Sequence, residues 1–112
     1  VELPANSSQK DEQNSHALRL SRMSLNSGSG STSSRSVKIT SSVDGKPTHY
    51  RASESSTFEG ASWQAYAGTP VFELSAGKGN KTVYFQVKKS VAVGNGSIDR
   101  ESRTMSDNIK LR

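Results

Sequence analysis

The chain has 112 residues, a formal net charge of +5, no cysteine and only 30% hydrophobic residues. This length fits one domain, and an apolar share below the usual ~45–50% leaves few positions to form its core. The lack of cysteine excludes disulfides and thiolate metal sites. The sequence holds no run of about 18 apolar residues, so we expect no membrane-spanning helix within it.

The first seventeen residues, VELPANSSQKDEQNSHA, are polar and have no hydrophobic period. Low hydrophobicity with mixed charge makes a poor strand and a poor isolated helix. We therefore expect a flexible tether over residues 1–17, followed by one folded domain over residues 18–112. Such a tether would suit a domain that hangs from a membrane anchor or from a preceding domain.

The first strand is expected over residues 18–25. Leu20 has one parity along this strand, whereas Met23 and Leu25 have the other. A β-bulge or a strand switch near Ser21–Arg22 would reconcile the two parities.

Residues 26–34 (NSGSGSTSS) have the composition of a flexible loop. Residues 35–41 then alternate, with Val37 and Ile39 inward, which predicts a half-buried antiparallel strand. Asp44-Gly45 predicts a turn after it.

The next strand is expected over residues 47–53, with Tyr50 on one face and Arg51 on the other. A short strand follows over residues 71–75. Gly77 to Asn80 predict a tight, hairpin-type connection because glycine and asparagine tolerate positive φ. The clearest strand, over residues 81–88, turns three side chains inward: Val83, Phe85 and Val87.

We expect residues 91–103 to form a loop with its tip at residues 94–96, and residues 105–111 to form the last strand. The total is about seven short strands with turn signals between them and no convincing helix. This pattern predicts an all-β fold, an antiparallel β-sandwich with Greek-key connections.

Three motifs stand out from Pro47 onward: PTHYRASES-x-x-FEGASWQAY, PVFELSAGKGNKTVYFQVK and SDNIKL. They resemble the bacterial immunoglobulin-like, fibronectin type III-like domains of secreted and cell-surface proteins. The resemblance covers roughly Arg19 to Leu111 and is strongest from Pro47 to Lys88. It implies an immunoglobulin-like β-sandwich, used as a spacer, an adhesion unit or a carbohydrate-associated domain. The chain departs from the family after Lys88, where SVAVGNGSIDRES replaces a shorter turn.

No residue pattern points to catalysis. His16 and His49 are the only histidines, too few for a zinc site or for a convincing nucleophile relay. Gly77-Lys78-Gly79-Asn80 lacks the Gly-Lys-Ser/Thr end of a phosphate-binding loop, and no helix follows it. We expect no enzymatic activity, no metal and no cofactor.

The aromatic residues of the central stretch are the candidates for ligand recognition. Exposed aromatic rings on a flat face can stack on sugar rings. For Trp63, however, we rather expect a position in the core, because the chain has few apolar residues to form one. Tyr84 points away from its inward neighbours and lies on the same strand face as Lys88. The candidate ligand-binding residues are Trp63, Tyr66, Tyr84, Arg51 and Lys88.

The basic residues are dispersed along the chain, whereas nucleic-acid-binding proteins usually cluster them, so we expect no nucleic-acid partner. The sequence and its resemblance favour a non-catalytic, extracellular structural or protein-interaction module of a bacterial surface or secreted protein. The alternative is a carbohydrate-binding module that recognises polysaccharide through exposed aromatics. The expected partner is thus another protein or a polysaccharide at the cell surface.

Overall fold

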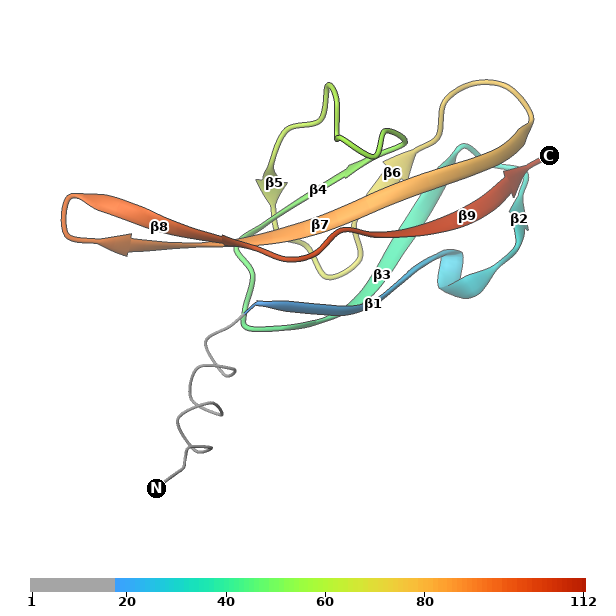
Figure 1. Ribbon diagram of the computed structural model, residues 1–112. Helices are drawn as coiled ribbons and strands as arrows, with labels where there is room; N and C mark the ends of the chain where they lie inside the picture. The colour runs from blue at the N-terminus through green and yellow to red at the C-terminus, as the bar shows by residue number, and fades with distance from the viewer. Residues whose placement is uncertain (1–17) are drawn as a thin grey trace.

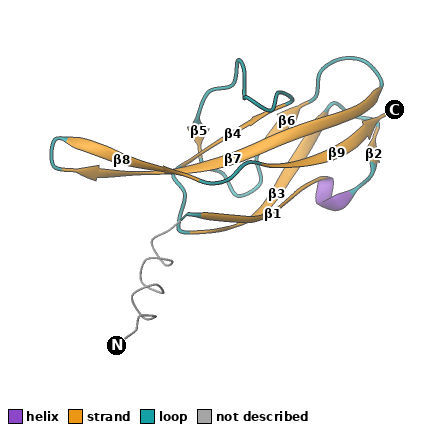
Figure 2. Ribbon diagram, viewed as in Figure 1, coloured by secondary structure: helices purple, strands orange, loops and turns teal. Residues whose placement is uncertain are grey.

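The fold is all-β, as predicted (Figures 1 and 2). A computed structural model describes residues 18–112, so the tether predicted over residues 1–17 lies outside the described residues. No α-helix occurs between residues 18 and 112. The elements are β1 (Arg19–Leu25), the 3₁₀ turn η1 (Asn26–Gly28), β2 (Ser31–Thr32), β3 (Ser36–Asp44), β4 (His49–Ser53), β5 (Gln64–Ala65), β6 (Val71–Glu73), β7 (Gly79–Val93), β8 (Gly96–Glu101) and β9 (Met105–Leu111).

The strands form two sheets. The smaller has the order β1-β3-β6, and the larger has the order β2-β9-β7-β4-β5, with β8 paired to β7. All pairs are antiparallel except β2 with β9, which is parallel. The strand segments outnumber the seven expected: β2 and β5 have only two residues each, and β8 forms where a loop was expected.

One hydrophobic core lies between the sheets. The alternation predicted for β7 is confirmed, because Val83, Phe85 and Val87 are fully buried. β9 contributes Ile109 and Leu111, as its alternation predicted. The other buried members of the core are Leu20, Met23, Leu25, Val37, Ile39 and Leu74.

Of the two alternatives predicted in β1, a bulge or a strand switch, the structure has the bulge. The register between β1 and β3 shifts between Leu20 and Arg22. Because one extra residue reverses the alternation, Leu20, Met23 and Leu25 all reach the core, with 1%, 7% and 0% exposure.

Polar residues from the quoted motifs join separate parts of the fold. The Glu54 carboxylate accepts hydrogen bonds from the Ser75 amide at 2.6 Å and the Ser75 hydroxyl at 2.9 Å. The Lys81 ammonium donates to the same hydroxyl at 2.9 Å. Asp107, in the motif SDNIKL, joins the two sheets: its carboxylate in the larger sheet accepts a hydrogen bond from the Leu25 amide of the smaller sheet at 2.9 Å. These motifs therefore stabilise the fold.

Two connections differ from the prediction. Gly77 and Gly79 do adopt positive φ, of 104° and 133°, but this turn joins β6 in one sheet to β7 in the other. The hairpin-type connection predicted there is wrong, although the turn itself is correctly placed. The loop predicted over residues 26–34 is interrupted by β2, in which Thr32 is buried.

The loop predicted over residues 91–103 is also wrong, although its tip at Gly94 is right. β7 continues to Val93 and turns back as β8, in register from Lys88–Glu101 to Val93–Gly96. Figure 1 shows this ribbon extending beyond both sheets. We call residues 88–101 the hairpin.

Candidate functional site

The outer face of the larger sheet, which points away from the core, carries a stacked arginine. The register between β4 and β5 pairs His49 with Ala65 and Tyr50 with Gln64, which brings Trp63 beside Arg51. The Arg51 guanidinium carbon lies 4.5 Å from the Trp63 ring centroid and 4.3 Å from the Phe58 ring centroid. A guanidinium at these distances is attracted to the ring electrons of both aromatics.

Phe58 reaches this position through a strained loop. Its φ is +59°, a left-handed conformation that a bulky residue adopts at a cost of about 1–2 kcal/mol. Its amide donates to the Ser55 carbonyl at 3.0 Å, and its carbonyl accepts from the Ala61 amide at 3.0 Å. Phe58 is only 5% exposed. The loop between β4 and β5 thus folds over the outer face and closes on Arg51.

Beneath this loop, Gln86 is buried, and its side chain makes three hydrogen bonds. Its side-chain oxygen accepts from Arg51 Nε at 3.0 Å and from an Arg51 terminal nitrogen at 2.8 Å. Its Nε2 donates to the Ser102 carbonyl at 2.7 Å. Arg51 therefore connects the loop to β7 and to the junction between β8 and β9. We call Arg51, Phe58, Trp63, Gln86 and Lys88 the Arg51 cluster.

Lys88 extends the cluster toward the hairpin. Its ammonium lies 4.7 Å from the Trp63 ring centroid and 3.7 Å from an Asp99 carboxylate oxygen. The Ser90 hydroxyl donates to Asp99 at 2.7 Å. That hydrogen bond, with a smaller contribution from the Lys88 charge, holds the pKa of Asp99 below its ordinary value.

The structure brings together three of the five candidate residues: Arg51, Trp63 and Lys88. Tyr84 lies on the same outer face, in register with Ser53 at the far end of β4. Tyr66 packs instead against the core.

Trp63 itself is half-buried and lies outside the core, so the expectation of a core tryptophan is wrong. Sequence alternation could not place it, because the loop that carries Trp63 has no strand period.

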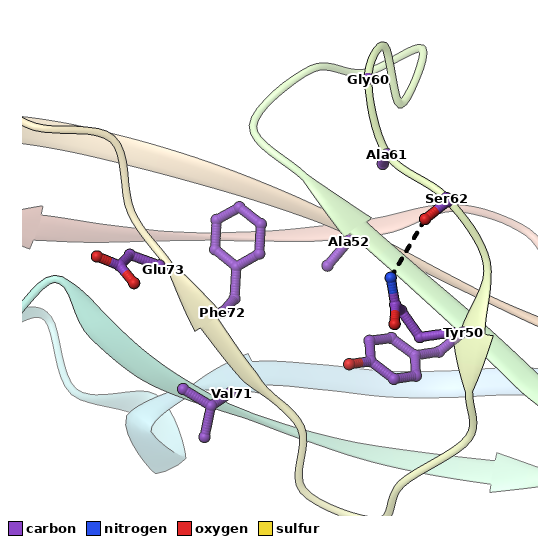
Figure 3. A pocket seen from close by; sticks show the side chains of 9 residues that line it. Tyr50, Ala52, Gly60, Ala61, Ser62, Val71, Phe72 and Glu73 are labelled. Atoms are coloured by element: carbon purple, nitrogen blue, oxygen red, sulfur yellow. Dashed lines mark hydrogen bonds between the residues drawn. The ribbon is translucent and has the colours of Figure 1, made fainter.

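A second feature, missed by the sequence reasoning, is a groove of about 380 Å³ at the open edge between the sheets (Figure 3). The rings of Tyr50 and Phe72 lie along it, and Ser62, Gln64 and Glu73 are among its polar lining residues. No sequence signal indicated it, because it forms where β4 and β5 of one sheet face β6 of the other.

The third feature is a group of three apolar side chains on one face of the hairpin, next to the paired Lys89 and Arg100. Val91, Val93 and Ile98 are 41%, 51% and 50% exposed, and they are three of the four large exposed hydrophobic residues in the described part of the chain. Val91 is directly opposite Ile98, and Val93 lies two residues further along the same strand. Since side chains alternate along a strand, all three point to one side. The two-residue spacing of Val91 and Val93 was the sequence signal for a strand here, but the glycine and polar residues around them have the composition of a loop.

Between residues 18 and 112, no group of three or more metal-ligating side chains comes together. His49 lies on the outer face, where its Nδ1 is 2.7 Å from the Thr48 hydroxyl. No helix among the described residues is both long and apolar enough to cross a membrane.

Comparisons of this chain with protein-family models, with curated proteins and with solved structures found no match. The function of the chain is therefore inferred from the geometry of these three features.

Proposed function

We propose that this chain is a non-catalytic protein-interaction module with an immunoglobulin-like β-sandwich fold, displayed on a bacterial cell surface or within a secreted protein. The hairpin is its binding element. The observation that carries this proposal is the cluster of Val91, Val93 and Ile98 on one face of a ribbon that extends beyond the sheets. Grouped apolar side chains on an exposed surface are typical of a site that another molecule covers.

The shape of the hairpin supports the same reading. Every residue of β8 is exposed, and so are the last three residues of β7. A two-stranded ribbon outside the core adds little to the stability of the fold. An exposed strand edge also offers unpaired amide and carbonyl groups to a second chain, which is the basis of recognition by strand addition.

Site-specific photo-crosslinking tests this function. A photoreactive amino acid replaces Val93 in one version of the chain and the exposed Lys38 of β3 in a control version. Each is incubated with surface proteins of the bacterium that produces the chain and is then illuminated. We expect covalent protein adducts from position 93 and not from position 38. Equal adducts at both positions, or none at either, would refute the proposal.

A second candidate is recognition of an acidic polysaccharide by the outer face. It is favoured by the position of Trp63, half-buried beside the cations of Arg51 and Lys88. Trp63 is the single tryptophan, so its fluorescence reports directly on this site. The candidate predicts a saturable change with acidic polysaccharides that Lys88→Gln weakens and that neutral polymers do not produce. If no polymer in the series changes the fluorescence, this candidate is wrong.

A further inference from the structure

β8 has one free edge. It pairs with β7 along Gly96–Glu101, and no other described strand pairs with it. This edge is six residues long and ends at Glu101, where the chain leaves β8 and continues to β9. An uncovered edge of this length can add a strand from another molecule.

The direction of the backbone groups along this edge follows from the hydrogen bonds at its base. The Val87 carbonyl accepts from the Ser102 amide at 2.9 Å, and the Val87 amide donates to the Ser102 hydroxyl at 3.0 Å. The next carbonyl, of Lys88, points to the opposite side and accepts from Thr48 at 2.8 Å. Because the direction alternates along an antiparallel strand, Val91 directs its groups at β8.

Its partner Ile98 therefore uses its amide and carbonyl inside the hairpin. The neighbouring residues of β8 have the opposite orientation, with their backbone groups aimed at the free edge. These outward residues are Ser97, Asp99 and Glu101.

A second copy of β8 fits this edge in one register better than in the others. In a symmetric antiparallel pair, one residue faces itself across the two-fold axis. An axis at Asp99 would oppose two carboxylates, and an axis at Arg100 would oppose two guanidinium groups. Like charges directly opposite each other are destabilising. An axis at Ser97 avoids like charges, but it places Ile98 opposite Gly96 and so loses any apolar contact.

An axis at Ile98 keeps like charges apart and also gives an apolar contact between the copies. Ile98 faces Ile98 of the second copy, and Ser97 faces Asp99. The outward backbone groups of Ser97 and Asp99 then form the hydrogen bonds between the copies. Ile98 falls in a non-hydrogen-bonded pair, in which facing side chains are closest. Val91 and Val93 of both copies lie on the same face, so the two apolar clusters become one.

We propose that two copies of this chain pair antiparallel through β8, with the two-fold axis at Ile98, to form a continuous four-stranded ribbon. This inference deepens the proposed function and rests on it, because it names a second copy as the partner of the hairpin.

The absence of native cysteine allows a direct test by disulfide trapping. Facing residues of a non-hydrogen-bonded pair have Cα atoms about 4.5 Å apart, which is within the range that a disulfide spans. Ile98→Cys should therefore form a disulfide-linked dimer under mild oxidation. Arg100→Cys is the matched control, since position 100 faces position 96 in this register and lies far from its own copy. Equal trapping at both positions would mean random collision, and dominant trapping at position 100 would mean another register; either result overturns the proposal.

Sedimentation of the protein without cysteine substitutions provides the second measurement. We expect a concentration-dependent dimer, and Ile98→Lys should weaken its association by at least about tenfold, since it places two like charges opposite each other. The melting temperature of Ile98→Lys should stay close to that of the original chain, because Ile98 lies outside the core. A purified chain that stays monomeric at millimolar concentration would overturn self-pairing.

The two proposals can fail separately. If the purified chain is monomeric but crosslinking from position 93 captures a different protein, self-pairing is wrong and the interaction function stands. If crosslinking also captures nothing, both proposals are wrong.

Discussion

Replacement of Arg51 by alanine should destabilise the fold strongly for a substitution outside the core. Arg51 supplies two hydrogen bonds to Gln86 and contacts two aromatic rings. Gln86 is only 7% exposed, so its oxygen would lose its donors with little access to water. A buried acceptor left without a partner costs about 1–3 kcal/mol. Loss of the two cation–aromatic contacts adds about 0.5–1 kcal/mol each at partly exposed positions.

Because neighbouring interactions are not additive, we expect Arg51→Ala to lower the free energy of unfolding by about 2–4 kcal/mol. Urea unfolding followed by far-ultraviolet circular dichroism measures this change. Trp63 fluorescence, followed in parallel, should show easier quenching by acrylamide even in the folded protein, because the ring loses the arginine that covers it. The control is Lys110→Ala, which removes an exposed cation from the outer face of the same sheet.

A double substitution separates the hydrogen bonds from the packing. With Gln86→Leu already in place, Arg51→Ala should cost less than it does alone, since the loss of Arg51 then leaves no further buried acceptor without its donor. If Arg51→Ala changes the free energy of unfolding by less than about 0.5 kcal/mol, as ordinary surface substitutions do, the role assigned to the Arg51 cluster is wrong.

Three further predictions concern the turns and the base of the hairpin. Ser102→Ala should lower the free energy of unfolding in urea by about 1–3 kcal/mol, because a fully buried amide loses its acceptor; a change near zero would contradict this. Gly79→Ala should cost about 1–3 kcal/mol by the same assay, since its φ of 133° is strained for alanine, whereas Gly68→Ala, in open space, should be nearly neutral; equal effects would refute the backbone argument. The pKa of Asp99 is held below its ordinary 3.8, mainly by the hydrogen bond from Ser90. The stabilisation that this hydrogen bond gives should therefore be present above pH 3.8 and be lost as the pH falls through the lowered pKa of Asp99. Carbon-13 NMR titration should show the Asp99 pKa rising in Ser90→Ala, and an unchanged pKa would contradict the assigned cause.

The core was predictable because successive side chains of a strand point to opposite faces of the sheet, so alternation in the sequence indicates which side chains are buried. Val83, Phe85 and Val87 repeat with the period of a pleated strand, so their burial followed directly. The bulge in β1 was predictable for the same reason, since only a reversal of parity could bring Leu20 and Met23 to one face.

What escaped prediction depends on contacts between distant parts of the chain. The turn at Gly77 was visible from composition, but composition does not say whether a turn joins neighbours in one sheet or crosses to the other. The hairpin was hidden because Gly94 and polar residues around it resemble a loop, although Val91 and Val93 keep the strand period.

The candidate site was predictable in part. Arg51 and Lys88 were placed on the outer face by alternation, and the structure agrees. Trp63 follows a loop whose path depends on the stacking of Phe58 and Arg51, and no local pattern encodes that stacking.

The most direct test of the account is an NMR map of where the folded molecule binds. The nitrogen-15-labelled chain would be mixed with excess unlabelled chain or with bacterial surface proteins, the partners proposed above, and the broadening of each amide signal would be measured. If the hairpin is the binding element, broadening should be confined to residues 88–101 and be strongest for the outward amides of Ser97 and Asp99. Broadening centred on Trp63 and Tyr84, or no broadening anywhere, would contradict the claim that the hairpin is the binding element.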